Sequence, residues 1–241
     1  MKKQLLLIAS THGDEPIGLE AIKILENKGY GKYFDILIAN PKALAQNVRF
    51  IDTDLNRSYP GNEKSNKYEK RLAAENLKIA KQYKYIIDIH QADKGKTDFI
   101  IIPRKKLPSN FPLDWLPLKT VLLWPEPRGP LGDVLKNCVE LEFGIMDRNY
   151  QLAINRAAGI IEKFILAMKC GKKNKITNKK IYLVDGFIRP QDWPGAKPEP
   201  IDFKRNFLKG SSFYPLLVNQ YADLEILCYK MKKIMASAPR Q

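Results

Sequence analysis

The hydrophobic positions of this chain form two kinds of pattern. Six short, mostly apolar runs predict buried strands, at 5–9, 34–38, 85–90, 99–102, 121–124 and 138–143. Three stretches with apolar side chains at helical spacing predict amphipathic helices, at 17–28, 65–82 and 149–168. Because strands and helices alternate along this part of the chain, the pattern predicts an α/β fold.

The composition changes after residue 168. Residues 169–180 are rich in lysine and poor in apolar side chains, which is typical of a linker. The segments beyond it resemble strands only, at 181–184, 213–218 and 224–231. We therefore predict an α/β domain over 1–170, a basic linker over 171–180 and a small β-rich subdomain over 181–241.

The chain has two histidines, and both fall where a predicted strand meets a loop. His12 and Glu15 lie on a tight turn directly after the run 5–9, and His90 ends the run 85–90. Ligands of open α/β sheets bind at the carboxyl ends of the strands. Two imidazoles and one carboxylate leave the fourth position of a zinc ion open, as in catalytic zinc sites. The pair of histidines with Glu15 therefore predicts a catalytic metal site.

A polar loop follows the second predicted strand and its Asn40-Pro41 pair. It carries two arginines, two aspartates and one asparagine between Arg49 and Arg57. No helical or strand period accounts for these charges. Long irregular loops inside compact domains are usually functional, so we interpret this loop as part of the site.

The net charge of +15 favours polyanions, or a small acidic substrate that is steered into a cleft. The lysines are scattered or clustered in the linker, and no nucleic-acid motif is visible, so we interpret them as a solvated surface and expect no nucleic-acid partner. Three widely separated cysteines make no disulfide framework and indicate a reducing compartment. We find no signal peptide and no membrane-spanning stretch, which predicts a cytoplasmic protein. The oligomeric state stays open.

Together, these motifs resemble the succinylglutamate desuccinylase/aspartoacylase family, a branch of the zinc carboxypeptidase superfamily. The resemblance rests on the His12–Glu15 turn, on Asn40-Pro41, on the block R-x-x-D-x-D-L-N-R at 49–57, and on Asp88-Ile89-His90. It covers residues 4–144 in order and the β-rich tail more loosely. It implies a mixed central sheet with helices on both faces, plus a small C-terminal β-rich subdomain.

The resemblance also implies a ligand set. His12, Glu15 and His90 would bind one zinc ion per chain. Asp88 lies two residues before His90 and is placed to accept a hydrogen bond from that imidazole, as carboxylates near metal-ligating histidines commonly do.

The loop and the sixth predicted strand supply the remaining implied roles. Arg49 would polarise the scissile carbonyl, Asn56 and Arg57 would hold a substrate carboxylate, and Asp54 would brace their loop. Glu142 would be the general base. Glu140 points to the same face of its strand, but Glu142 is nearer the carboxyl end and precedes Phe143-Gly144, as the family's base does. We expect Glu140 to pair with a cation or to brace the site.

The sequence therefore predicts a zinc-dependent hydrolase that cleaves the amide bond of a small acidic N-acyl amino acid. A zinc carboxypeptidase that acts on short peptides would use the same metal and base, so it stays an alternative. A catalytically idle relative that binds a polyanion is the third possibility. The short loops before Glu142 leave the acyl group open, because those loops shape the acyl pocket in the family.

Overall fold

A computed structural model describes residues 3–92, 97–126, 128–145, 149–171, 179–194, 200–221 and 224–234. Its strands are β1 (Leu5–Ala9), β2 (Phe34–Ile38), β3 (Tyr85–Ala92), β4 (Phe99–Ile102), β5 (Thr120–Leu123), β6 (Cys138–Gly144), β7 (Lys180–Ile188), β8 (Asn206–Leu208), β9 (Ser211–Leu216) and β10 (Cys228–Ile234). Its α-helices are α1 (Ile17–Asn27), α2 (Pro41–Gln46), α3 (Tyr68–Ala80), α4 (Leu131–Val134) and α5 (Tyr150–Lys169). Short 3₁₀ turns occupy Gly31–Tyr33, Leu55–Arg57, Leu113–Trp115 and Pro190–Asp192.

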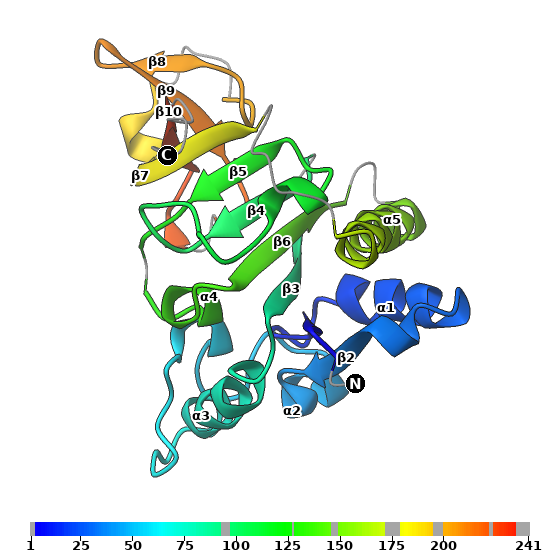
Figure 1. The fold of residues 1–241 in the computed structure, drawn as a ribbon. Coiled ribbons are helices and arrows are strands. Elements are labelled where there is room, and N and C mark those ends of the chain that lie inside the picture. Colours follow the sequence, from blue (N-terminus) through cyan, green and yellow to red (C-terminus); the bar gives the residue numbers. More distant parts are fainter. Residues whose placement is uncertain are drawn as a thin grey trace.

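In the described part of the chain, ten strands form one mixed sheet in the order β2-β1-β3-β6-β4-β5-β7-β10-β9-β8. Strands β2, β1, β3 and β6 run parallel to one another, and β4 is antiparallel to β6. The carboxyl ends of β1, β3 and β6 therefore meet at one edge of the sheet. Figure 1 shows this sheet crossing the molecule from the β2 end to the β8 end.

Helices cover both faces of the parallel part of the sheet. The side chains of β1 show this, because successive ones belong to two different hydrophobic clusters. Leu5 and Leu7 belong to the cluster that includes side chains of α1 and α5. Leu6 and Ile8 belong to the cluster that includes side chains of α3. Successive side chains of a strand point to opposite faces, so one apolar run contributes to both layers. The predicted fold class, a mixed sheet between helices, is confirmed.

The predicted strands all form; 5–9, 34–38 and 99–102 have the predicted ends, and the ends of the others are shifted. Strand β3 continues past His90 to Ala92, so the expectation that the strand stops at this histidine is wrong. The last predicted strand, 224–231, starts later and is β10. The pattern did not predict α2, α4 or β8, each of which is six residues or shorter. Runs this short carry too few positions to show a period.

The β-rich tail continues the main sheet. Strand β7 pairs in parallel with β5, and β10 pairs with β7, so the hydrogen-bonded ladder passes from the α/β part into the tail without a break. The division into separately folding units stays a prediction. Most of the predicted linker, 172–178, lies outside the described residues. None of the helices in the described ranges is long and apolar enough to cross a bilayer.

Candidate active site

The turn after β1 is shaped by a close approach of two backbones. A Cβ atom on Gly13 would lie 2.1 Å from the backbone carbon of Ala43 in α2, so only glycine fits there. The Gly13 N–H donates to the Arg49 carbonyl at 3.3 Å. Ser10, just before the turn, is buried and has a φ of 56°, a conformation that costs free energy for a residue with a side chain. These contacts fix the turn that carries His12 and Glu15.

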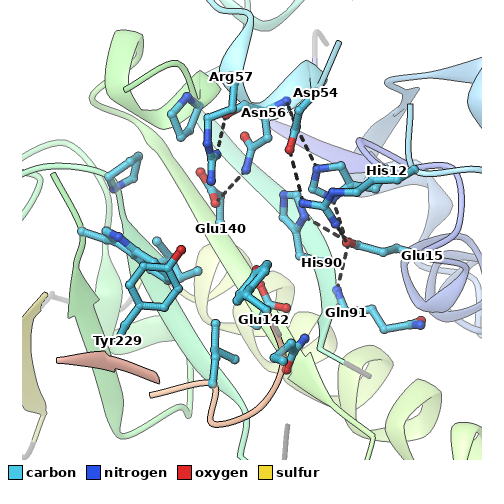
Figure 2. A pocket seen from close by; sticks show the side chains of 18 of the residues that line it. His12, Glu15, Asp54, Asn56, Arg57, His90, Gln91, Glu140, Glu142 and Tyr229 are labelled. Atoms are coloured by element: carbon cyan, nitrogen blue, oxygen red, sulfur yellow. Dashed lines mark hydrogen bonds and ion pairs between the residues drawn. The ribbon is translucent and has the colours of Figure 1, made fainter. Parts of the chain in front are cut away.

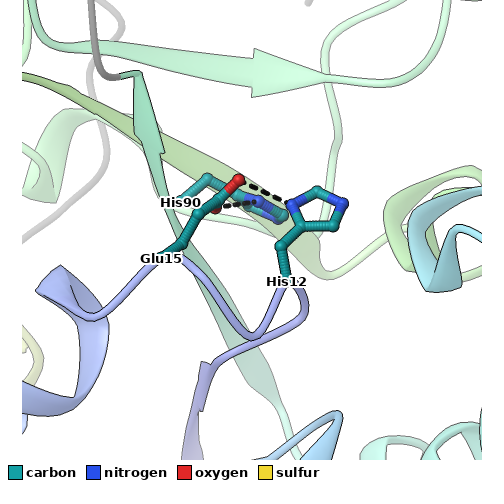
Figure 3. A group of neighbouring side chains, drawn as sticks. All are labelled: His12, Glu15 and His90. Atoms are coloured by element: carbon teal, nitrogen blue, oxygen red, sulfur yellow. Dashed lines mark hydrogen bonds and ion pairs between the residues drawn. The ribbon is translucent and has the colours of Figure 1, made fainter. Parts of the chain in front are cut away.

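Three donor side chains converge at the edge of the sheet (Figure 3). His12 Nδ1 lies 2.7 Å from Glu15 Oε1, and His90 Nδ1 lies 3.1 Å from Glu15 Oε2. All three side chains are buried, and their donor atoms lie within 4.8 Å of one another. The neighbouring, parallel strands β1 and β3 bring the two histidines together although they are far apart in sequence.

The second nitrogen of each histidine faces a carboxylate. His12 Nε2 lies 3.1 Å from Asp54 Oδ1, and His90 Nε2 lies 3.2 Å from Asp88 Oδ2. Thr11 Oγ1 donates to both oxygens of Asp88, at 2.9 and 3.1 Å. Carboxylates beside metal-ligating histidines orient the imidazole rings. Here the Nδ1 atom of each ring lies against Glu15. Asp88 lies beside the His90 ring, and its role as the hydrogen-bond acceptor of that ring stays a prediction. Asp54 contacts His12 as well as its own loop.

Charge holds the cluster together. Burial alone would raise the pKa of Glu15, but His12 and His90 outweigh it and hold that pKa well below its usual range. Burial alone would lower the pKa of His90, but Asp88 and Glu15 raise it well above its ordinary value. Two imidazole nitrogens and one carboxylate oxygen within 4.8 Å of one another are the donor set of a catalytic zinc site, so these residues fit a zinc ion. Binding it requires that both histidines lose their protons.

The loop that follows α2 brings the arginines to this cluster. Arg49 Nη1 lies 3.3 Å from Glu15 Oε1, and Arg49 Nη2 lies 3.3 Å from Asp54 Oδ2. Asp54 Oδ1 accepts the Asn56 N–H at 2.8 Å and caps the short 3₁₀ turn. Arg57 Nη1 donates to the Asn56 carbonyl at 2.7 Å, and its other N–H groups have no acceptor among the described residues. Figure 2 shows Arg57 and Asn56 on one side of the cavity, above Glu140.

The two glutamates of β6 occupy different environments. Glu142 lies opposite His90 in the parallel pairing of β6 with β3, and Glu140 lies opposite Asp88. Glu140 is 4% exposed and accepts a hydrogen bond from Asn56 Nδ2 at 3.4 Å. The hydrogen-bond partner is thus an amide, and the expected role of Glu140, to pair with a cation or to brace the site, stays a prediction. Burial, then the charge of Glu15, raises the pKa of Glu142 to about 8.

The metal cluster, the arginine loop and the two glutamates of β6 line a cavity of about 610 Å³. Its opposite wall comes from segments in which no candidate site residue was predicted from the sequence. They contribute Ile101, Pro103, Trp124, Pro130, Leu217, Tyr221, Leu224 and Tyr229. Figure 2 shows Tyr229 across the cavity from Glu15. The β-rich tail therefore closes the site, and no local pattern in the sequence indicates that long-range contact.

Residues 1–117 match the sequence model of a family described as the succinylglutamate desuccinylase/aspartoacylase catalytic domain. The match covers just under half of the chain. The resemblance inferred from the motifs is confirmed. A stretch of 63 residues is 38% identical to a probable aspartoacylase of Acaryochloris marina; it covers 24% of this chain and 21% of that relative.

Solved structures share the fold over nearly the whole chain. The succinylglutamate desuccinylase of Chromobacterium violaceum superposes with a TM-score of 0.75 at 17% identity, covering 98% of this chain and 86% of that one. Murine aminoacylase 3 superposes with a TM-score of 0.72 at 19% identity, covering 96% of this chain and 95% of that one. At these identities the likeness shows the fold, and it includes the β-rich tail that the family match to residues 1–117 does not reach.

Proposed function

We propose that the chain is a zinc-dependent hydrolase that cleaves the amide bond of N-acyl amino acids, with one zinc per chain. The observation that carries the proposal is the convergence of His12, Glu15 and His90 beside Glu142, all facing one cavity. When bound, zinc would supply Lewis acidity that polarises the scissile carbonyl and acidifies a water molecule. The neighbouring chemistry comes from the side chains of this chain.

Glu142 is proposed to transfer the proton. It would take a proton from the attacking water as the C–O bond forms, and would return it to the amide nitrogen as the C–N bond breaks. A carboxyl group that titrates near neutral pH is suited to both steps, and the pKa of Glu142 is raised to about 8. Arg49 would stabilise the negative charge that develops on the carbonyl oxygen. Its guanidinium lies beside Glu15, one of the proposed metal ligands, and so close to where the carbonyl would react.

Arg57 and Asn56 are proposed to hold the carboxylate of the amino acid. Among the described residues, the guanidinium of Arg57 has N–H groups without an acceptor, and an arginine fork binds a carboxylate through two parallel hydrogen bonds. Among the described residues, Asn56 Oδ1 and Glu140 Oε1 are buried without a hydrogen-bond partner, and both residues line the cavity. Buried polar atoms without partners are rare, so a substrate N–H is a fitting partner for them.

The opposite wall is suited to the uncharged part of the substrate. The rings of Trp124 and Tyr229 meet edge to face, with centroids 4.6 Å apart, and Tyr221 packs against Tyr229 with centroids 5.7 Å apart. All three rings are half-buried and pack on the hydrophobic cluster that contains Leu217. We propose that the acyl group or the amino-acid side chain lies on this aromatic surface.

Cytoplasmic location stays part of the proposal, since the cysteines are unpaired.

A panel of amides tests the function. Zinc-loaded protein is incubated with N-acetyl, N-succinyl and N-benzoyl amino acids and with dipeptides, and release of the free amine is measured. We expect hydrolysis of N-acyl amino acids with a free carboxylate, and its loss in Glu142→Gln. Faster cleavage of dipeptides than of every N-acyl amino acid would favour a carboxypeptidase. Absence of cleavage throughout, with zinc bound, would contradict the proposal.

A further inference from the structure

One buried carboxylate outside the cavity contacts the loop that carries the arginines. Glu69, on the first turn of α3, is 0% exposed. Its Oε1 accepts the N–H of Ile51 at 2.6 Å, and its Oε2 accepts the N–H groups of Asp52 and Thr53 at 2.9 and 3.1 Å. Asn40 Nδ2 donates to Oε1 as well, at 3.2 Å. Four donors thus surround one side chain, which does not appear among the residues that line the cavity.

The N–H groups of residues 51–53 belong to no helix or strand that would supply their hydrogen-bond acceptors. Residues 49–54 form neither helix nor strand, and regular structure resumes only at the 3₁₀ turn Leu55–Arg57. Buried backbone donors need partners, and a carboxylate is a strong one. Burial alone would raise the pKa of Glu69, but the N–H donors outweigh it and lower that pKa below its ordinary value. The side chain is therefore held as an anion by the loop.

A second contact returns from the loop to the helix. Asp52 Oδ2 accepts the N–H of Tyr68, the first residue of α3, at 2.7 Å. The loop thus caps α3, while α3 binds the amides of the loop. The two contacts fix residues 51–53 on both sides, midway between Arg49 and the 3₁₀ turn that ends at Arg57.

From this geometry we infer that Glu69 is a positioning residue: it holds the loop so that Arg49, Asp54 and Arg57 face the metal cluster and the substrate. The inference rests on the proposed function for its kinetic consequences, although the contacts stand without it. The metal ligands His12, Glu15 and His90 lie outside the loop. Loss of Glu69 should therefore disturb substrate binding and oxyanion stabilisation more than metal binding.

Glu69→Gln tests the inference, because it keeps the shape of the side chain but removes its charge and places an N–H₂ group against backbone donors. Glu75→Gln is the matched control, since Glu75 is exposed on the same helix. We expect kcat/KM of Glu69→Gln to fall on the order of 10²-fold, the size seen when a reacting group is displaced by about 1 Å. The KM should rise, bound zinc should stay near one equivalent, and Glu75→Gln should match the wild type.

A double-mutant cycle with Arg57→Ala separates positioning from general destabilisation. If Glu69 acts through the loop, Glu69→Gln should cost much less in the Arg57→Ala background than in the wild type, because part of its effect is already lost. Fully additive losses would overturn the inference, and so would loss of zinc together with activity.

Amide hydrogen exchange measures how firmly the loop is held and needs no substrate. The N–H groups of 51–53 should exchange at least tenfold faster in Glu69→Gln than in Glu75→Gln, while those of β1 and β3 keep their rates. Unchanged exchange at 51–53 would overturn the inference. If the wild-type protein hydrolyses none of the amides, the proposed function fails, but the exchange rates still decide whether Glu69 holds the loop.

Discussion

Exchange of either glutamate of β6 for glutamine should separate the base from its neighbour. Glu142 lies opposite His90 in the strand pairing and faces the cavity, whereas Glu140 lies opposite Asp88 and contacts Asn56. Adjacent strands lie about 4.8 Å apart, so the carboxylate of Glu142 is within reach of the metal cluster. General acid–base catalysis contributes roughly 10²- to 10⁴-fold, and Glu142→Gln should lose that much in kcat.

The pH dependence of stability gives a second test of Glu142→Gln. The pKa of Glu142 in the folded protein is raised from 4.5 to about 8 by burial and by Glu15. Between these values the folded state binds more protons than the unfolded state, so metal-free protein loses stability as pH rises through this window, with no further loss from Glu142 above it. Glutamine cannot ionise. Glu142→Gln should therefore keep stability that the wild type loses between about pH 4.5 and pH 8.

The assay combines three measurements on both variants: zinc per chain, the unfolding free energy of metal-free protein against pH, and kcat on the best amide. We expect Glu142→Gln to bind zinc and fold but to lose turnover, while Glu140→Gln keeps most of kcat and loses stability, because Asn56 then faces an amide. A dead Glu140→Gln enzyme beside an active Glu142→Gln enzyme would refute the assignment of the base. Normal turnover in both would refute the mechanism.

Two further variants test the ligands and the substrate carboxylate. His90→Ala should lose bound zinc, as measured by elemental analysis of protein purified without chelator, and a full equivalent in this variant would show that the ligand set is wrong. Arg57→Ala should lower kcat/KM about thirtyfold, the low end for a charge-assisted pair because Arg57 is exposed. Amidation of the substrate carboxylate should cost the wild type a similar factor and the variant little more, whereas equal losses in both would count against Arg57.

The sequence predicted the parallel core well because its strands are continuous apolar runs. The runs 5–9 and 34–38 match β1 and β2 residue for residue, since both ends of each run are marked by polar or turn residues. Placement of His12 and His90 at one sheet edge followed from parallel strands, which the structure confirms for β1 and β3. The roles of these residues stay predictions.

Contacts that join distant segments could not be predicted. Thr11 donates to Asp88 of β3, and Glu69 accepts three N–H groups of the loop. Neither residue lies in a motif that marks such a contact. Trp124 and Tyr229 meet only because β10 pairs with β7, which extends the sheet from β5. Local periodicity fixes which face of a strand is buried, but not which strand lies beside it.

Removal and return of the metal test the central claim most directly. The protein is stripped with a chelator, and hydrolysis of the best N-acyl amino acid is followed while zinc is added back in measured steps. The account predicts no turnover without zinc, a linear gain that stops at one zinc per chain, and no gain in His90→Ala. Full turnover in stripped protein that contains no measurable zinc would contradict it.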